Sequence, residues 1–327
     1  ASLGADRTAV AISAGKFHTC AILDDGSVSC WGRNDQTQLG DSTWDDRNTP
    51  TQTASLGADR TAVAISAGAK HTCVILDDGS VSCWGQNDYG QLGDGTSEVG
   101  ESPTQTASLG AGRTAVAIAA GRQHTCAILD DGSVSCWGWN DVAGHLGDGT
   151  NENRNVPGQT ASLGAGRTAV AITASRHTCV ILDDGSMSCW GENGDGQLGD
   201  GTTDDRNTPT QTASLGAGRT AIAASADRDH ICAILDDGSV SCWGNNEFGG
   251  MGGGNTSGPD PNPWPTQTSS LGTGRTAVAI AAGFGYTCTI LDDGSVSCWG
   301  LNDEGQLGDG TYFQRTTPTQ TSSLGVG

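Results

Sequence analysis

Short apolar runs separated by polar turns give this chain the two-residue period of β-strands. The first stretch predicts strands at residues 9–14, 19–23, 27–31 and 51–56. The first run is small and apolar, as expected of an inner strand, and the last is rich in threonine, as expected of an outer strand. Asp24-Asp25-Gly26 separates the second and third runs, and glycine at the third position suits a three-residue hairpin loop. No helical pattern of useful length occurs, so the sequence predicts an all-β protein.

This strand pattern repeats along nearly the whole chain. The segment CAILDDGSVSCW from Cys20 to Trp31 returns, with few changes, at spacings of 53, 53, 53, 53 and 56 residues. The repeats span residues 1–53, 54–106, 107–160, 161–212, 213–268 and 269–327. Four short strands in about 50 residues are typical of one propeller blade. The sequence therefore predicts a single β-propeller domain with six blades of four antiparallel strands. An incomplete seven-bladed propeller is the alternative.

The hairpin also accounts for the cysteines. With residues 24–26 as the loop, Cys20 faces Cys30 at a non-hydrogen-bonded position, where side chains of neighbouring strands are closest. The same spacing predicts six disulfides within the blades: Cys20–Cys30, Cys73–Cys83, Cys126–Cys136, Cys179–Cys189, Cys232–Cys242 and Cys288–Cys298. Free thiols or zinc binding are the alternatives. Six disulfides would indicate an oxidising compartment, so we expect a secreted, extracellular or cell-surface protein.

The charge balance excludes several classes of partner. The chain has 16 basic and 37 acidic residues, a formal net charge of −21. Nucleic acids and anionic membranes attract basic surfaces, so neither is an expected partner. No apolar run approaches 18 residues, and no membrane span is predicted.

Two segments resemble a known family. The stretch from Gly121 to Gly138, GRQHTCAILDDGSVSCWG, and the stretch from Asn87 to Thr96, NDYGQLGDGT, are similar to the regulator of chromosome condensation (RCC-type) repeat. The resemblance implies a propeller of four-stranded blades. It also implies several roles known in that family: nucleotide exchange on a small GTPase, β-lactamase inhibition, plant ultraviolet sensing and protein docking. The paired cysteines resemble secreted bacterial versions of the repeat.

The recurrent polar and aromatic residues favour structural roles over catalysis. A histidine precedes the second strand in five of the six copies, and we expect its ring to bond a neighbouring backbone group. The recurrent tryptophan, Trp31 in the first copy, is expected to pack in the core or between blades, with sugar stacking or light absorption as alternatives. The Asp-Asp-Gly turns are expected to bond local backbone, although calcium binding is an alternative. No cofactor, metal or catalytic residue is predicted, and we expect no enzyme activity.

The segments that follow Leu-Gly-Asp differ in every copy, and a rigid scaffold commonly presents binding residues on such loops. They hold the candidate binding residues Trp44, Trp264, Tyr312 and Phe313. Asn255-Thr256-Ser257 is a glycosylation sequon in the longest of them.

We therefore expect a non-enzymatic extracellular binding or structural scaffold with an unknown protein or glycan ligand. A multivalent lectin and an inhibitor or docking module like the β-lactamase-inhibiting propellers are the alternatives. The chain has seven Ser-Leu-Gly segments for six repeats, from Leu3 to Leu324. The extra copy is either a frayed end or an extension onto a neighbouring subunit, which would assemble the protein into extracellular fibres.

Overall fold

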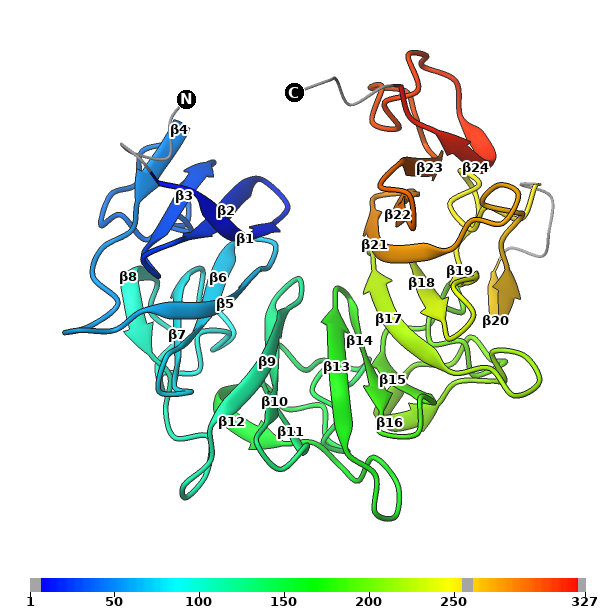
Figure 1. Cartoon of the computed structure of the whole chain (residues 1–327). Coiled ribbons are helices and arrows are strands. Elements are labelled where there is room, and N and C mark those ends of the chain that lie inside the picture. The colour runs from blue at the N-terminus through cyan, green and yellow to red at the C-terminus, as the bar shows by residue number, and fades with distance from the viewer. Residues whose placement is uncertain (1–6, 255–260, 323–327) are drawn as a thin grey trace. The chain divides into compact units, whose positions relative to one another are not determined.

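The computed structural model describes residues 7–254 and 261–322, and it contains six four-stranded antiparallel sheets (Figure 1). Each sheet is one repeat, with its strands in chain order. The all-β, six-bladed propeller predicted from the sequence is confirmed. All 24 strands of the described residues belong to these six blades.

The bounds of the strands recur from blade to blade. Blades 1 to 3 comprise β1 (Ala9–Ala14), β2 (His18–Leu23), β3 (Val28–Gly32), β4 (Arg47–Gln52), β5 (Ala62–Ala67), β6 (His71–Leu76), β7 (Val81–Gly85), β8 (Gly100–Gln105), β9 (Ala115–Ala120), β10 (His124–Leu129), β11 (Val134–Gly138) and β12 (Arg154–Gln159). Blades 4 to 6 comprise β13 (Ala169–Ala174), β14 (His177–Leu182), β15 (Met187–Gly191), β16 (Arg206–Gln211), β17 (Ala221–Ala226), β18 (His230–Leu235), β19 (Val240–Gly244), β20 (Asn262–Gln267), β21 (Ala277–Gly283), β22 (Tyr286–Leu291), β23 (Val296–Gly300) and β24 (Arg315–Gln320).

The first three strands of each blade lie where the hydrophobic pattern places them, and the β2–β3 register pairs Cys20 with Cys30. The expected fourth strand at 51–56 is wrong, because β4 covers Arg47–Gln52. The chain leaves the sheet after Thr53 and turns at Ser55, whose hydroxyl accepts a hydrogen bond from the Gly57 N–H. Gly57 has a φ of 120°, which side chains disfavour, so the Ser-Leu-Gly segment forms a turn.

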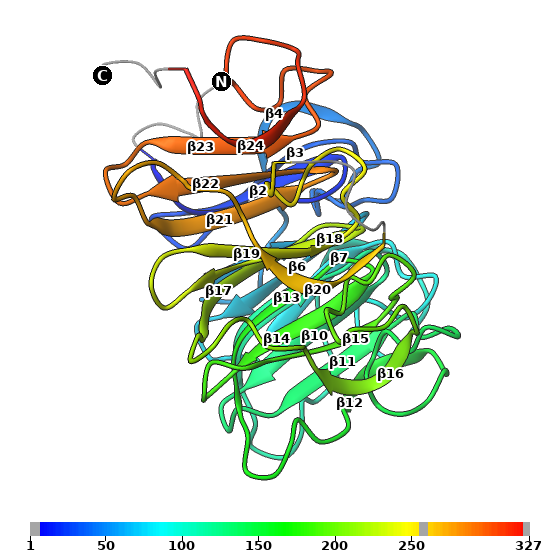
Figure 2. The same ribbon diagram turned by 90° about the vertical axis from the view of Figure 1, so that its right-hand side faces the viewer.

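The hydrophobic core lies between the sheets of neighbouring blades. Ile22, Val28 and Leu39 of blade 1 form one buried cluster with residues of blade 2 that include Val74 and Trp84. The sheets of the last two blades are likewise stacked face to face, with β21 against β17 and β18 (Figure 2). A blade therefore buries its apolar side chains mainly against the next blade.

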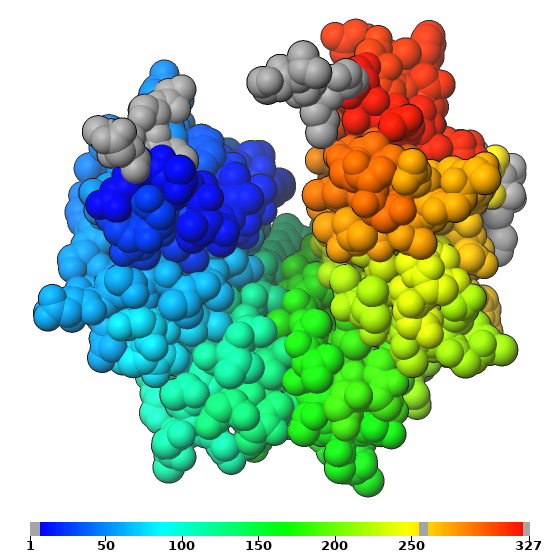
Figure 3. All heavy atoms as spheres, viewed as in Figure 1, coloured from blue at the N-terminus to red at the C-terminus, as the bar shows by residue number. Residues whose placement is uncertain are grey.

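The chain divides into two compact units, Ala1–Ser175 and Arg176–Gly327. The boundary falls between β13 and β14 of blade 4. Within each unit, blades that follow each other in the chain are in contact, from blue to green in the first unit and from green to red in the second (Figure 3). That the six repeats form a single domain stays a prediction.

The outer strand of every blade contains a proline: Pro50, Pro103, Pro157, Pro209, Pro265 and Pro318. A proline has no N–H to donate to an added strand, so it protects a sheet edge from pairing with another chain. Across residues 7–254 and 261–322, no helix is long and apolar enough to cross a membrane.

Candidate functional site

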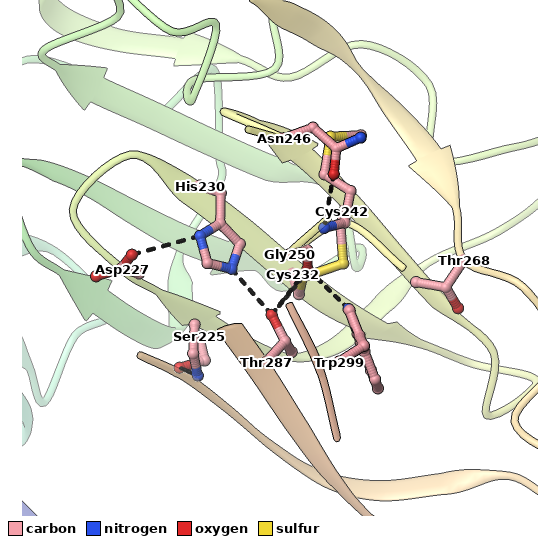
Figure 4. The surroundings of a disulfide bond; sticks show 12 residues. Ser225, Asp227, His230, Cys232, Cys242, Asn246, Gly250, Thr268, Thr287 and Trp299 are labelled. Carbon is pink, nitrogen blue, oxygen red and sulfur yellow. Dashed lines mark hydrogen bonds and ion pairs between the residues drawn. A yellow bond between two sulfur atoms is a disulfide. The ribbon is translucent and has the colours of Figure 1, made fainter. Parts of the chain in front are cut away.

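All twelve cysteines form disulfides within their blades in the structure. The Cα atoms of Cys20 and Cys30 are 4.1 Å apart, and the other five pairs have the same separation: Cys73–Cys83, Cys126–Cys136, Cys179–Cys189, Cys232–Cys242 and Cys288–Cys298. Figure 4 shows that Cys232–Cys242 lies next to Thr287 of the following blade, with 3.5 Å between Cys232 Sγ and Thr287 Oγ1. Each disulfide thus joins the second and third strands of its blade, and Cys232–Cys242 lies at the interface with the following blade.

Each blade has two ends that carry different turns. One end carries the Asp-Asp-Gly turn between its second and third strands, and we call it the hairpin end. The other carries the turn between the first and second strands and the residue that follows the third strand. A backbone hydrogen bond joins these two parts in each blade, for example from the Arg33 N–H to the Phe17 carbonyl at 2.9 Å. We call this second end the turn end.

The hairpin end is the same in all six copies because it is part of the scaffold. The Asp25 carboxylate accepts hydrogen bonds from the Ser27 N–H and hydroxyl, and these bonds hold the pKa of Asp25 below its usual range. Arg7 forms an ion pair with the same carboxylate at 2.6 Å. A Cβ on Gly26 would lie 2.3 Å from Thr61 Cβ of the next blade. The Asp-Asp-Gly aspartates therefore organise the hairpin and its ion pairs, as the sequence predicts for local backbone bonding.

The recurrent histidines connect neighbouring blades. His18 Nε2 lies 2.8 Å from Thr72 Oγ1 of blade 2, and that hydroxyl donates to the Gln38 carbonyl at 3.0 Å. The Trp84 indole N–H donates to the same carbonyl at 3.0 Å. Because the threonine uses its proton on the carbonyl, the imidazole Nε2–H is the donor to the threonine. The ring of His18 is thus bound by a side-chain hydroxyl of the next blade, in addition to any backbone partner that the sequence predicts for this position.

The same contact between a histidine and a threonine of the next blade recurs for His71 and His230. His71 and His230 lie 2.9 Å from Thr125 and Thr287, respectively. Burial lowers the pKa of His18 to about 4 and is the main reason why the pKa of His71 falls to about 3. His18 and His71 thus act as neutral hydrogen-bond donors between blades.

These pKa shifts predict acid sensitivity. A histidine whose pKa is lower in the folded state binds protons more readily when the chain is unfolded. The contribution of its neutral ring to the free energy of unfolding is therefore complete above pH 6.5 and is lost as the pH falls. For His18 and His71 we expect a loss of roughly 3 kcal/mol each in the free energy of unfolding at pH 4. Urea unfolding between pH 7 and pH 4 measures it. The double variant His18→Gln/His71→Gln should have a shallower pH dependence, and an unchanged dependence would refute this assignment.

The recurrent tryptophans are interblade residues. Trp84, Trp137, Trp190, Trp243 and Trp299 are completely buried. A Cβ on Gly93 would meet the Trp137 indole at 2.7 Å, so the glycine of Leu-Gly-Asp lets the indole of the next blade pack against the backbone. Packing between blades is therefore confirmed for these rings, and their burial leaves no ring face to stack on a sugar.

The variable loops after Leu-Gly-Asp also join blades. Trp44 is half exposed and donates from Nε1 to the Glu101 carboxylate of blade 2 at 3.1 Å. Trp264 of β20 has its ring against Gly201 of blade 4. Tyr312 and Phe313 of blade 6 are 73% and 72% exposed, which leaves them available to a partner. The structure thus places the four candidate residues in three different blades. Asn255 lies outside the described residues, as do Leu3 and Leu324 of the terminal segments.

The turn ends of the individual blades are candidate binding regions that the sequence pattern alone did not predict. Ten of the 16 basic residues either precede an inner strand or begin an outer strand. Arg7 and Arg47 are examples of the two positions, and each forms an ion pair with an aspartate of its own blade. The other six are Lys16, Arg33, Lys70, Arg122, Arg176 and Arg228, and every one lies at a turn end. Exposed apolar side chains lie there too, including Phe17 and Phe284 at 41% and 50% exposure. The signal was available in the sequence, because these turns differ in every copy whereas the Asp-Asp-Gly-Ser turns do not.

Comparisons with known proteins agree with this architecture. The sequence profile of the RCC1-like domain matches residues 2–326. The ultraviolet-B receptor UVR8 of Arabidopsis thaliana is 30% identical over 315 residues, which are 96% of this chain and 70% of UVR8.

Two solved structures share the fold. Yeast RCC1 (Prp20), in a complex with Kap60, has a TM-score of 0.84 at 19% identity, covering 97% of this chain and 75% of that one. The CRINKLY ectodomain of the Arabidopsis thaliana receptor kinase ACR4 has a TM-score of 0.54 at 20% identity, covering 90% and 80%. Because the profile spans almost every residue and UVR8 aligns along nearly the full chain, this protein belongs to the RCC1-like domain family.

Proposed function

We propose that the protein is a non-enzymatic extracellular module that binds another protein through the turn ends of its blades. One observation carries this proposal: the turn ends differ from copy to copy and hold all six basic residues that lie outside the two recurrent arginine positions. Arginine and aromatic residues are enriched in protein interfaces. Turn ends that differ from blade to blade suit recognition of an asymmetric partner.

The contacts at the turn ends support recognition rather than scaffolding. Arg33 and Lys70 both pair with Asp35, at 2.6 and 3.5 Å, and all three side chains are partly exposed. Lys16 and Arg33 also lie over the Phe17 ring, 4.9 and 5.2 Å from its centroid. Because exposed ion pairs of this kind add little to stability, a partner protein can compete for these charged side chains at low cost.

Two facts support an extracellular setting. Disulfides persist in oxidising compartments, and six of them in one domain would be unusual in a reducing cytosol. The ACR4 structure with the same fold is an ectodomain, and the RCC1 structure is a complex with another protein. Protein binding outside the cell combines both features.

The lectin and fibre alternatives receive less support. A lectin with six equivalent clefts would need exposed tryptophans, and five of the six recurrent ones are completely buried. A fibre built by strand addition would need receptive outer strands, and each outer strand contains a proline.

Site-specific photo-cross-linking tests the proposal. A photoreactive phenylalanine analogue is placed at Gln86, the turn-end residue of blade 2, and separately at Ser80 in the hairpin turn of the same blade. Both side chains are partly exposed. Irradiation in the native extracellular medium, followed by mass spectrometry, should yield a partner adduct from the turn-end position. Adducts formed equally at both positions would contradict the proposal.

A further inference from the structure

A pocket of about 300 Å³ opens at the turn ends of the second unit. Its walls come from the β17–β18 turn, the β21–β22 turn and the segments that follow β15 and β19. The side chains that matter for its chemistry are Asp195, Arg228, Asp229, Glu247, Phe248 and Phe284.

The pocket exists because the fifth copy lacks a side chain that fills this place elsewhere. The residue before the recurrent Leu-Gly is Gln38 in copy 1, Gln91 in copy 2 and Gln197 in copy 4, and each of these glutamines is completely buried. The fifth copy has Gly250 at this position, and Gly250 lines the pocket. Removing a buried glutamine side chain leaves space between the turns that would otherwise be filled.

The fifth copy also brings an acidic residue to this place. Asp227 replaces the glycine found in the first three copies. Its carboxylate accepts a hydrogen bond from the Gly285 N–H at 3.1 Å and lies 3.4 Å from His230 Nδ1 (Figure 4). These contacts fix the β17–β18 turn against the β21–β22 turn, so the pocket has a rigid base.

The remaining carboxylates give the pocket an excess of negative charge. Asp195 accepts a hydrogen bond from the Asn245 side chain at 3.2 Å, and Asp229 pairs with Arg228 at 3.1 Å. Burial is the largest influence on Asp229 and raises the pKa of its carboxyl group. The exposed Glu247 carboxylate has no hydrogen-bond or ion-pair partner in the described part of the chain. One arginine therefore faces four carboxylates.

The aromatic residues complete a site for a cation. The Phe248 and Phe284 rings have centroids 6.2 Å apart. The Arg228 guanidinium lies 5.8 Å from the Phe284 centroid while it pairs with Asp229. A cation is attracted both by an aromatic ring face and by a neighbouring carboxylate. The Arg228 guanidinium has this arrangement at the edge of the pocket.

We propose that this pocket receives a lysine or arginine side chain of the partner protein. The proposal rests on the proposed function, because it identifies one point of contact at the turn ends. A volume of about 300 Å³ lies at the small end of ligand pockets and suits a single long side chain. The carboxylates select positive charge, and the phenylalanines cover the methylene groups.

The test uses N-acetyl-arginine amide and N-acetyl-lysine amide as probes, with N-acetyl-norleucine amide as the uncharged control. Binding to the full oxidised chain is followed by NMR titration. We expect millimolar binding of at least one cationic probe, at least fivefold tighter than norleucine and weaker at high salt. Equal affinity for norleucine, or no binding of either cation, would overturn the proposal.

Three variants locate the binding site. Gly250→Gln restores the side chain of the other copies, and the Cβ it adds would lie 3.1 Å from the nearest atom, the Gly285 carbonyl oxygen, so only a small adjustment is needed. It should abolish probe binding, and Glu247→Gln should weaken it at least threefold. Asp88→Asn changes the matching residue of copy 2 and should have no effect. Unchanged binding in the first two variants would refute the pocket as the site. If the probes bind but no turn-end adduct forms in the cross-linking experiment, the proposed function fails and the pocket does not.

Discussion

Replacing Trp137 with alanine is expected to cost about 3–5 kcal/mol in the free energy of unfolding, the usual range for a large buried aromatic residue. The Trp137 indole is completely buried and donates to the Gln91 carbonyl of the preceding blade at 3.0 Å. The variant therefore loses packing between two blades and leaves a carbonyl without one of its donors. Denaturant unfolding followed by circular dichroism measures the change.

A neighbouring tryptophan provides the control. Trp139 lies at the turn end of the same blade, is partly exposed and stacks on His145 with ring centroids 4.4 Å apart. We expect Trp139→Ala to cost less than half as much as Trp137→Ala. Equal losses in the two variants would contradict the assignment of the recurrent tryptophan to the blade interface.

Reduction is expected to unfold the chain. In the chain-entropy model, each ten-residue disulfide loop stabilises the folded state by roughly 2–3 kcal/mol. Six such bonds together match or exceed the stability of about 5–15 kcal/mol typical of a folded domain. Adding a reductant to the folded protein should therefore abolish its near-ultraviolet circular dichroism and expose the buried tryptophans.

Mass spectrometry checks the premise of that prediction. The intact oxidised chain should be lighter than the reduced chain by twelve hydrogens, and peptide mapping should place every bond within one blade. Free thiols, bonds between blades, or a native near-ultraviolet spectrum after complete reduction would each show that the bonds do not hold the fold.

The sequence predicted what depends on local geometry. A three-residue loop determines which residues face each other across a hairpin, so the pairing of Cys20 with Cys30 followed from the position of Gly26. The fourth strand was misplaced because the alternating threonines Thr49, Thr51 and Thr53 continue past Gln52, where β4 ends. The turn that begins at Ser55 prevents the strand from extending to residue 56.

Contacts between blades could not be predicted from one repeat. The partner of His18 is Thr72, 54 residues away, and their distance depends on how two sheets stack. The pocket was missed for a related reason. Gly250 looks like one more glycine in a glycine-rich loop until the buried glutamines of the other copies show what it replaces.

The sequence did not indicate the turn ends because the most variable and most aromatic segments are the long loops after Leu-Gly-Asp. Those loops contain Trp44 and Trp264, whose contacts join one blade to another. The shorter variable turns, such as Gly15-Lys16-Phe17 and Asp227-Arg228-Asp229, also contact the next blade, through the Lys16 N–H and the Asp227 carboxylate. They nevertheless present exposed side chains, among them Phe17 and Arg228. The sequence shows that these turns differ between copies. It does not show that each turn contacts the residue that follows the third strand of its blade.

The comparison of cross-linking at Gln86 with cross-linking at Ser80 is the most direct test of binding through the turn ends. Both positions are partly exposed and belong to blade 2, so they differ mainly in the end of the blade that they report. We predict a partner adduct at least tenfold more abundant from the Gln86 position. An adduct that forms mainly from the Ser80 position, or only with other copies of this chain, would contradict the proposed function.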